Sequence, residues 1–503
     1  MKLSDKPGLF IIISICVVYV LLRLWNLTDS CLWFDEIFSI HAAEHDWKNL
    51  FWFVAQDLIH PPLFYVLLKI WIIVGGESLF WLRFFPVFFS IIAVIPFVLL
   101  GRQLKLSPST VAVALAFFAV NGSCIKYSQE VRMYSLLLCL ALFSLWLFVR
   151  FLNTDEGFWL LVFVNIALVY SHYFGWLIIT SEVLAVVLLT REKLKRILLM
   201  SLIALSSFAP WLYAIWQASK INADVGQNIG WMAKPNILAV FRFAFDLFEP
   251  IYFEQSTKDS SAIFLITLPI IAINMIALVF YCVDWKAQSA AEKRDLCLLL
   301  IFIFTPILLA FAASWILPYS VWGTRHLIVA FAPFVMLLAV IFSKIKFRQL
   351  RTAGLSAVLL LCAAALLVQA VRPEPKYIWC AWENLAENLD KSQPTKIYVF
   401  EDLVAYHFWF ALRESDANLQ IIKINGIEGL IEDKAYFLPR DFDKIQKTKE
   451  FSGEQFFIVF RDKIFNEFAP PLQNLTVQRY KIGEPQIYEA QGLKAFLVEV
   501  KKQ

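Results

Sequence analysis

The chain has 503 residues, of which 60% are hydrophobic and only 17% are charged, and its formal net charge is +4. Soluble globular chains are nearer half apolar and about a quarter charged, so this chain has more apolar side chains than one soluble core can bury. The composition therefore excludes an ordinary soluble protein and indicates that lipid is the solvent over much of the length. The small net charge gives no reason to expect a nucleic-acid partner.

Hydrophobic segments follow one another from the N-terminus to about residue 371. Lys2 and Lys6 precede the first apolar run, and no small-residue cleavage site follows it, which indicates a retained helix. A bilayer needs about 20 apolar residues per helix. By that criterion we predict about eleven spans, near residues 8–26, 80–100, 108–123, 132–151, 157–172, 174–190, 197–217, 261–283, 296–316, 327–343 and 352–371.

The orientation of these spans depends on the short apolar run 62–74. If this run lies along the outer interface and does not cross, every strongly basic loop falls on one side, which is cytoplasmic under the positive-inside rule. Those loops carry Arg102 and Lys105, 191–196, Lys293 and Arg294, and 344–351. The N-terminus is then inside and the C-terminus outside. Residues 37–58, with aromatic side chains among polar ones, are predicted to form another interfacial helix.

The composition changes at about residue 373, after Pro373 and Pro375 stop the last span. Short β-type runs then alternate with polar stretches, with one helix expected near 401–413. The predicted strands are Lys396–Phe400, Gln420–Ile424, Ala435–Leu438, Phe456–Phe460, Val477–Ile482 and Lys494–Val500. We therefore expect a mostly α polytopic membrane domain over 1–372 and a small α/β or α+β soluble domain over 373–503 outside the membrane.

Cysteine usage indicates no metal or redox motif. The eight cysteines are scattered, with no close pair, so neither a zinc site nor a dense disulfide framework is implied. A bridge between Cys31 and Cys380 is left open. Two adjacent acids, Asp35 and Glu36, without other well-spaced ligands do not indicate a divalent metal, although they leave room for one.

With this orientation, polar residues from separate connections collect at the outer face. Asp35 and Glu36 are either a solvated interfacial pair or a base that deprotonates an acceptor hydroxyl or amine. His60, before two prolines, either starts a helix or donates a hydrogen bond to a phosphate. Glu130 either orients Arg132 or is only its ion-pair partner.

Cations and aromatic residues complete this set. The cations either reach lipid headgroups or form a pocket for a phosphorylated lipid, since arginine matches phosphate geometry. These are Arg83, Lys126, Arg132, Arg325 and His326. The aromatic residues either form an ordinary interfacial belt or stack on a sugar ring. These are Tyr127, Tyr134, His172, Tyr173, Trp176 and Trp322.

The order and spacing of these motifs resemble those of the C-type membrane glycosyltransferases, in particular the dolichyl-phosphate-mannose protein mannosyltransferase and lipid A aminoarabinose transferase group. The resemblance covers roughly the first 340 residues. It rests on Asp35-Glu36, His60-Pro-Pro-Leu, Trp81-Leu-Arg-Phe-Phe-Pro86, Tyr127-Ser-Gln-Glu-Val-Arg-Met-Tyr134 and Arg325-His326. Several members of the group have a lysine where this chain has His60.

The resemblance implies transfer of a sugar from a polyprenyl-phosphate carrier to a lipid, glycan or protein acceptor on the non-cytoplasmic side, with inversion at the anomeric carbon. It implies Asp35 as the base and His60, Arg83, Arg132 and Arg325 as candidates for the carrier phosphate. Transport of a polyisoprenoid-linked sugar and a non-catalytic role in glycan assembly are the alternatives. Transport would require polar residues through the middle of the spans, which the sequence shows to be mostly apolar. The sequons at Asn26 and Asn121 fall beside the proposed site, where a glycan would obstruct it, so we expect a bacterial inner membrane.

Overall fold

The computed structural model describes residues 6–220, 225–230, 232–251, 260–283, 288–371, 376–389, 395–413, 419–424, 446–468, 472–490 and 492–503. They form two compact units. The first comprises residues 1–27, 58–221 and 232–373, and the second comprises 28–57, 222–231 and 374–503. The strand expected at 435–438 lies outside the described residues.

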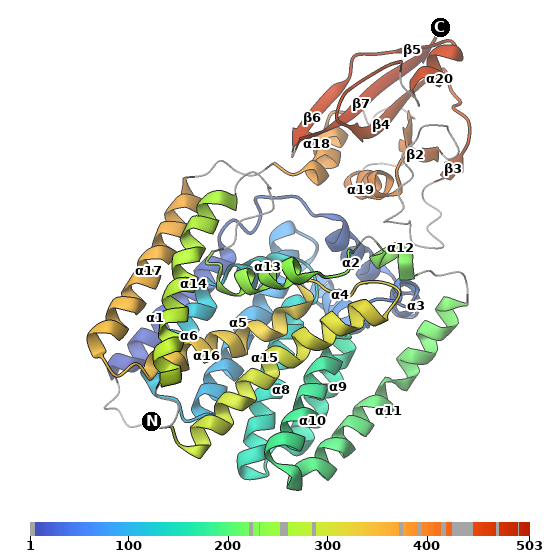
Figure 1. Ribbon diagram of the computed structural model, residues 1–503. Helices are drawn as coiled ribbons and strands as arrows, with labels where there is room; N and C mark the ends of the chain where they lie inside the picture. The colour runs from blue at the N-terminus through green and yellow to red at the C-terminus, as the bar shows by residue number, and fades with distance from the viewer. Residues whose placement is uncertain are drawn as a thin grey trace. The chain divides into compact units, whose positions relative to one another are not determined.

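The first unit is built from helices (Figure 1). They are α1 (Lys6–Leu24), α4 (Leu63–Gly75), α5 (Leu79–Gln103), α6 (Pro108–Val120), α7 (Gly122–Gln129), α8 (Tyr134–Thr154), α9 (Phe158–Ser171), α10 (Gly175–Leu189), η2 (Arg191–Lys193), α11 (Leu194–Ser219), α13 (Ile237–Phe248), α14 (Ser260–Val283), α15 (Ala290–Ile316), η4 (His326–Ala330), α16 (Phe331–Ser343) and α17 (Arg348–Ala370).

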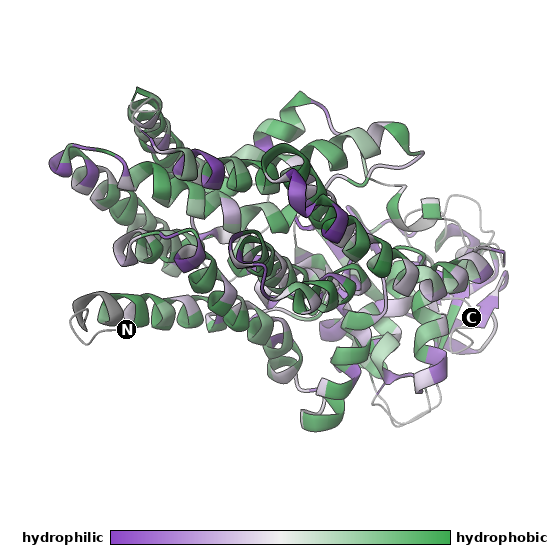
Figure 2. Ribbon diagram, turned by 90° about the horizontal axis from the view of Figure 1, so that it is seen from below, coloured by the Kyte–Doolittle hydropathy of each residue, from purple (hydrophilic) through white to green (hydrophobic). Residues whose placement is uncertain are grey.

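Seven helical segments among the described residues are long and apolar enough to cross a bilayer, and five more are apolar but shorter. The long ones correspond to α5, α8, α11, α14, α15, α16 and α17. The shorter ones include α4, predicted to lie at the interface, and α6, predicted to cross, and each has 13 residues. The expected polytopic helical domain is confirmed, whereas the count of eleven spans stays a prediction. Figure 2 shows hydrophobic residues along most of these helices.

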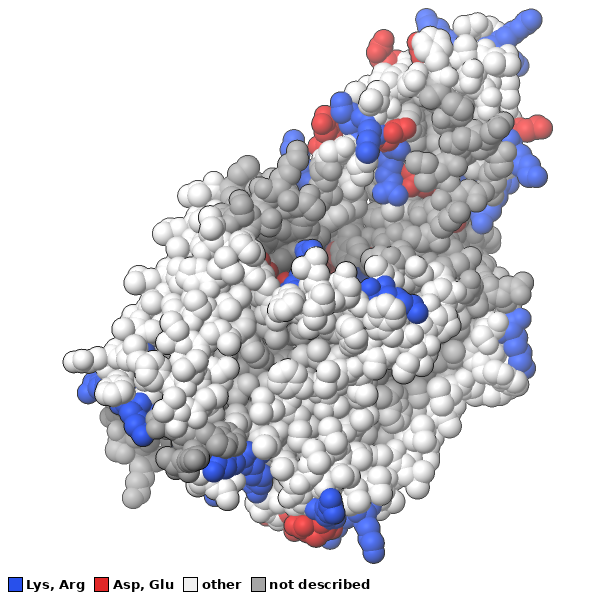
Figure 3. Space-filling model, viewed as in Figure 1, with Lys and Arg blue, Asp and Glu red and all other residues white. Residues whose placement is uncertain are grey.

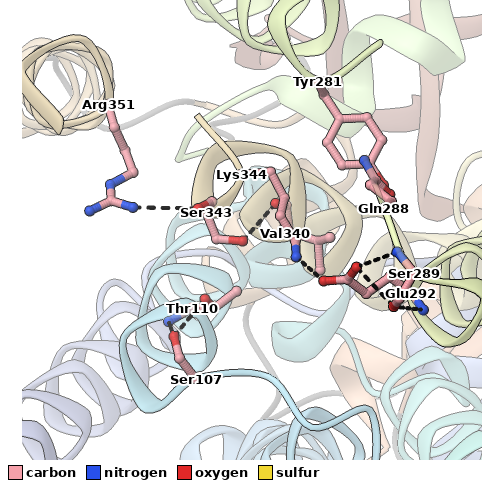
Figure 4. A network of polar contacts seen from close by, with 10 residues as sticks. All are labelled: Ser107, Thr110, Tyr281, Gln288, Ser289, Glu292, Val340, Ser343, Lys344 and Arg351. Atoms are coloured by element: carbon pink, nitrogen blue, oxygen red, sulfur yellow. Dashed lines mark hydrogen bonds and ion pairs between the residues drawn. The ribbon is translucent and has the colours of Figure 1, made fainter. Parts of the chain in front are cut away.

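The basic loops predicted to share the cytoplasmic side meet at one end of this unit. Asp155, after α8, pairs with Lys193 and with Arg196, whose Nη1 lies 3.0 Å from Asp155 Oδ1. Lys344, after α16, pairs with Glu292, which caps α15 at Ser289 (Figure 4). Figure 3 shows lysines and arginines along the lower end of the unit, below a broad surface without charged residues.

Polar side chains also hold helices together inside the first unit. Arg23 on α1 is fully buried, and its guanidinium donates to Ser90 Oγ on α5 at 2.9 Å and to the Ala119 carbonyl on α6 at 3.1 Å. Farther along the chain, Ser144 on α8, Asn165 on α9 and Glu182 on α10 are all fully buried and contact one another. The spans are therefore less uniformly apolar than the sequence suggested.

The second unit combines two early helices with the C-terminal sheet. Its helices are α2 (Phe34–Glu44), α3 (Trp47–Asp57), α12 (Val225–Ile229), η5 (Ile378–Cys380), α18 (Ala381–Glu387), α19 (Asp402–Leu412) and α20 (Leu472–Val477). Its strands are β1 (Thr395–Val399), β2 (Leu419–Ile424), β3 (Gln446–Thr448), β4 (Gln455–Asp462), β5 (Tyr480–Ile482), β6 (Gln486–Ala490) and β7 (Leu493–Lys502).

The strand order is β3-β2-β1-β4-β7-β5, and β6 also pairs with β7. β1 to β4 are parallel, whereas β7 is antiparallel to β4, with Val459 opposite Leu497. Alternating side chains such as Tyr398 and Ile458 form the core on one face, and their neighbours Ile397 and Val459 are also fully buried. The small α/β domain is thus confirmed. The start of the strand expected at 477–482 is instead the end of α20.

The predicted interfacial helix over 37–58 is two helices. α2 ends at Glu44, and His45 has extended backbone dihedrals. Asp46 then begins α3, because its Oδ1 accepts hydrogen bonds from the backbone N–H groups of Lys48 and Asn49 at 2.9 and 3.0 Å. A carboxylate in this position satisfies N–H groups that the first turn of a helix leaves free. The prediction of one continuous helix was wrong for this reason.

Candidate active site

Two of the predicted phosphate-binding residues contact each other in the first unit. His60 precedes α4, and Arg132 lies between α7 and α8; both are buried. Arg132 Nη2 lies 3.1 Å from His60 Nε2, and its Nη1 donates to Tyr65 Oη at 3.5 Å. Because a guanidinium can only donate, His60 Nε2 accepts, and the His60 proton is on Nδ1.

Two further histidines adjoin this pair. The His172 ring centroid is 5.9 Å from that of His60 and 5.3 Å from that of His326. His172 Nδ1 accepts a hydrogen bond from the backbone N–H of Phe174 at 3.1 Å, which places the ring proton on Nε2. This buried Nε2 has no hydrogen-bond partner among the described residues.

His172 is held neutral. Because its Nδ1 accepts the Phe174 N–H, the buried imidazole carries its one proton on Nε2. A neutral imidazole with an unsatisfied Nε2–H is a hydrogen-bond donor that calls for an acceptor. The site therefore combines the positive charge of Arg132 with an unsatisfied N–H donor, a combination that suits an anion.

Aromatic residues connect the histidines to Lys126 at the end of α7. The Tyr134 ring is 6.2 Å from the His326 ring and 5.3 Å from the Tyr127 ring. Lys126 Nζ lies 5.4 Å from the centroid of Tyr127. Seven residues predicted separately, from four connections, are thus linked in one cluster: His60, Lys126, Tyr127, Arg132, Tyr134, His172 and His326.

Four other predicted site residues belong to this unit but lie outside the linked cluster. Arg83, buried on α5, donates from Nη1 to the Leu27 carbonyl at 3.0 Å. Tyr173 Oη donates to the Leu58 carbonyl at 3.4 Å. Arg325 caps η4, and its charge acts on both His172 and His326. Glu130 directly follows α7, and its backbone carbonyl accepts from the Arg132 N–H at 2.6 Å.

Two acids at the end of α13 were missed by sequence reasoning. Asp246 Oδ2 accepts from Thr324 Oγ1 at 2.7 Å, immediately before Arg325. Burial raises the pKa of Asp246. The pKa of Glu249 is raised to about 7, mainly by burial and to a smaller extent by the negative charge of Asp246, while the positive charge of Lys126 opposes this shift. The predicted spans 197–217 and 261–283 leave residues 218–260 without a predicted element, although the apolar positions of 237–248 recur at helical spacing.

Asp35 and Glu36 begin α2 in the second unit. The Glu36 carboxylate is fully buried and accepts from the backbone N–H of Trp33 at 3.2 Å, so it closes the first turn of the helix. Asp35 is only partly buried. Of the two acids, Asp35 is thus the less buried one. Within the part of the chain that the structure describes, no three acid, histidine or cysteine side chains are placed to hold a metal ion.

This architecture, a polytopic helical domain with a small sheet domain after the last span, is the fold of C-type membrane glycosyltransferases, so the resemblance seen in the sequence is confirmed at the level of the fold. The solved structures with this fold include ArnT from Cupriavidus metallidurans. Its complex with undecaprenyl phosphate matches with a TM-score of 0.59 and 12% identity over 98% of both chains. Its apo state matches with a TM-score of 0.55 and 11% identity over 98% of both chains.

A complex of the oligosaccharyltransferase AglB from Archaeoglobus fulgidus with an inhibitory peptide and a dolichol-phosphate gives a TM-score of 0.48 at 12% identity. That match covers 82% of this chain but 64% of AglB, so the chain spans less than two thirds of the length of that enzyme. No protein-family model and no curated protein sequence matches the chain.

Proposed function

We propose that this protein transfers a sugar from a polyprenyl-phosphate carrier to a lipid, glycan or protein acceptor at the outer face of a bacterial inner membrane. The observation that carries the proposal is the buried cluster of Arg132, His60 and His172, in which the guanidinium contacts His60 and the His172 Nε2–H has no hydrogen-bond partner among the described residues. The ArnT structure with the same fold was solved bound to undecaprenyl phosphate, an anion of the required kind.

In the proposed reaction, the prenyl phosphate is the leaving group at the anomeric carbon of the sugar. The bond between the anomeric carbon and the phosphate oxygen breaks, and its electron pair remains on the prenyl phosphate, where Arg132 and the His172 N–H stabilise the charge. The acceptor oxygen or nitrogen forms the new bond to the anomeric carbon and gives its proton to the Asp35 carboxylate. One displacement of this kind inverts the anomeric carbon. A phosphate leaves as an anion, so the reaction needs no general acid.

The test uses the full-length protein in nanodiscs with a panel of polyprenyl-phosphate sugars. We expect wild type to release sugar from one of them and Asp35→Asn to lose about 10²–10⁴-fold in kcat. Arg132→Ala should instead raise the donor KM as well, because it removes a phosphate contact. Asp29→Asn, which alters an exposed acid close to Asp35 in the chain, is the matched control and should behave as wild type.

Two results would contradict the proposal. Wild type that is folded but transfers no sugar from any donor would remove the enzymatic function. Equal turnover by wild type and a folded Asp35→Asn variant would remove Asp35 as the base.

A further inference from the structure

Helix α2, which carries Asp35, lies in the same compact unit as the C-terminal domain although more than 300 residues separate them in the sequence. Cys31, three residues before α2, forms a disulfide with Cys380 at the start of that domain. The domain thus has a covalent connection beside the proposed base.

Contacts along α2 reinforce this connection. His41 Nδ1 lies 2.6 Å from Tyr406 Oη, and Glu44 at the end of α2 pairs with Arg413 at 3.5 Å. His41 also contacts the ring of Trp409, with 4.9 Å between centroids. Tyr406 and Trp409 belong to α19, and Arg413 follows it directly. The disulfide therefore fixes the start of α2 to η5, and the His41 contacts and the ion pair fix its middle and end to α19.

α19 also places a histidine against Phe34, the residue that precedes the proposed base. The Phe34 ring, adjacent to Asp35, lies 5.9 Å from the His407 ring. His407 Nδ1 is 3.0 Å from the Leu403 carbonyl and donates to it, so Nε2 is an acceptor. This Nε2 is buried and has no hydrogen-bond partner within the described ranges.

The negative charge of Asp35 also acts on the pKa of His407. Burial lowers the pKa of His407 to about 4, and the negative charge of Asp35 is among the smaller effects that act against this shift. At neutral pH the imidazole is therefore uncharged. Its Nε2 lone pair is thus an unused acceptor in the environment of the start of α2.

We propose that the C-terminal domain positions the catalytic base, with α19 and the Cys31–Cys380 disulfide holding α2 and with His407 and Tyr406 as positioning residues for Asp35. This inference rests on the proposed function, in which Asp35 is the base. It gives residues 376–503 a part in catalysis, whereas the donor phosphate is bound by the first unit. It also makes activity dependent on oxidation of one cysteine pair.

The experiment measures turnover and hydrogen exchange in the full-length protein in nanodiscs. Loosening α2 should lower kcat and leave the donor KM unchanged, because the phosphate contacts are elsewhere. We expect a fall in kcat of about 10–100-fold for Cys31→Ser/Cys380→Ser and of about two- to tenfold for Tyr406→Phe, which removes the hydrogen bond and keeps the ring. His407→Gln, whose amide can again supply an acceptor, should retain more activity than His407→Ala.

Three controls make the result specific. Cys282→Ser alters an exposed free cysteine and should behave as wild type. A thiol reductant should slow wild type to the rate of the double serine variant and leave that variant unchanged. Backbone amides of α2 should exchange faster in the double variant, whereas those of α8 in the first unit should not.

The outcomes separate this inference from the proposed function. Wild-type kcat and wild-type exchange of α2 in the double variant, together with an inactive Asp35→Asn, would overturn the positioning role and leave the proposed function intact. An active Asp35→Asn would overturn the function and the inference that rests on it. A rise in donor KM that accounts for the whole loss of activity would also overturn the positioning role.

Discussion

Glu182 is an acid in the middle of the helical bundle, and its contacts define its protonation state. Ser144 Oγ lies 2.8 Å from Asn165 Oδ1 and 2.6 Å from Glu182 Oε1, and Asn165 Nδ2 donates to Glu182 Oε2 at 2.8 Å. Three contacts need three protons, and the serine hydroxyl and the amide supply one each. If the Asn165 side-chain oxygen and nitrogen are exchanged, one of the three contacts still lacks a proton. The Glu182 carboxyl must therefore carry the third proton.

The side chains of Ser144, Asn165 and Glu182 thus form a closed ring of hydrogen bonds, and the contacts within this ring are not available to a transported substrate. Polar residues in the middle of spans would otherwise favour the transport alternative. Here Ser144, Asn165 and Glu182 satisfy one another and connect α8, α9 and α10. The ring therefore has a structural role, and its presence is compatible with the proposed enzyme.

The ring predicts different effects for two substitutions of Glu182. Glu182→Gln can replace the carboxyl proton with an amide N–H, so the ring stays closed and the apparent Tm stays near that of wild type. Glu182→Ala leaves buried polar groups of Ser144 and Asn165 unsatisfied, which costs about 1–3 kcal/mol. Thermal unfolding of both variants in detergent measures the difference, and an equal loss of Tm in both would contradict the closed ring.

Glu249 predicts a pH dependence of stability. Its pKa is raised to about 7, mainly by burial and by the charge of Asp246, from an ordinary value of 4.5. Between these values the folded protein holds a proton that the unfolded chain has lost, so stability falls as pH rises from about 4.5 to about 7. Glu249→Gln should flatten this part of the curve of apparent Tm against pH. Glu192→Gln, at an exposed acid, is the control, and the same flattening in it would refute the assignment.

At the scale of elements, α13 is connected to α7 by one side chain. Asn121 Oδ1 accepts from the Cys124 N–H at 3.0 Å and caps α7, while its Nδ2 donates to the Leu247 carbonyl at 3.1 Å, near the end of α13. The backbone adds bonds from Gly122 N–H to the Glu249 carbonyl and from Ile251 N–H to the Val120 carbonyl. Asn121 thus places the acids of α13 beside Lys126. Because it is buried, Asn121 is closed to glycan attachment in this fold.

Two variants separate the two functions of Asn121. Asn121→Asp keeps an oxygen to cap α7 and loses the donor to Leu247, whereas Asn121→Ala loses both. We expect Asn121→Ala to lose an additional 0.5–2 kcal/mol of stability, about the value of an N-cap. Hydrogen exchange should be faster at α13 in both variants and faster at α7 only in Asn121→Ala. Unchanged exchange at α13 in both would show that the backbone bonds suffice.

The elements that the sequence predicted best are those with a long periodic or apolar pattern. The sequence predicted the helix before each basic loop and the strands at 395–399 and 493–502. Each of these elements is buried on one or both faces, and a buried face requires apolar residues that are visible in the sequence. The break at His45 and the helix at 237–248 were missed, since a single capping side chain and a short amphipathic run leave weak signals. The candidate site residues were selected by their predicted side of the membrane, and their role stays a prediction. No spacing in the sequence indicates that His172 presents its Nε2–H or that α19 contacts α2.

At the scale of the whole molecule, the connections alternate between two ends of the first unit. Residues 153–155, 193–196, 292–294 and 344 contact one another at one end. The connections that carry His60, Arg132, His172 and His326 meet in the cluster described above. Under the positive-inside rule we predict that the first end is cytoplasmic and that the cluster lies toward the outer side.

Cysteine labelling in intact cells tests this orientation. Glu192→Cys adds a thiol to the exposed connection between α10 and α11, and Lys463→Cys adds one to an exposed position after β4. A membrane-impermeant maleimide should label Lys463→Cys in intact cells and Glu192→Cys only after permeabilisation. Cys282 is exposed near the end of α14, so both changes are made in Cys282→Ser to remove background. Labelling in the reverse order would invert the topology, place the carrier phosphate on the cytoplasmic side and contradict the proposed outer-face reaction.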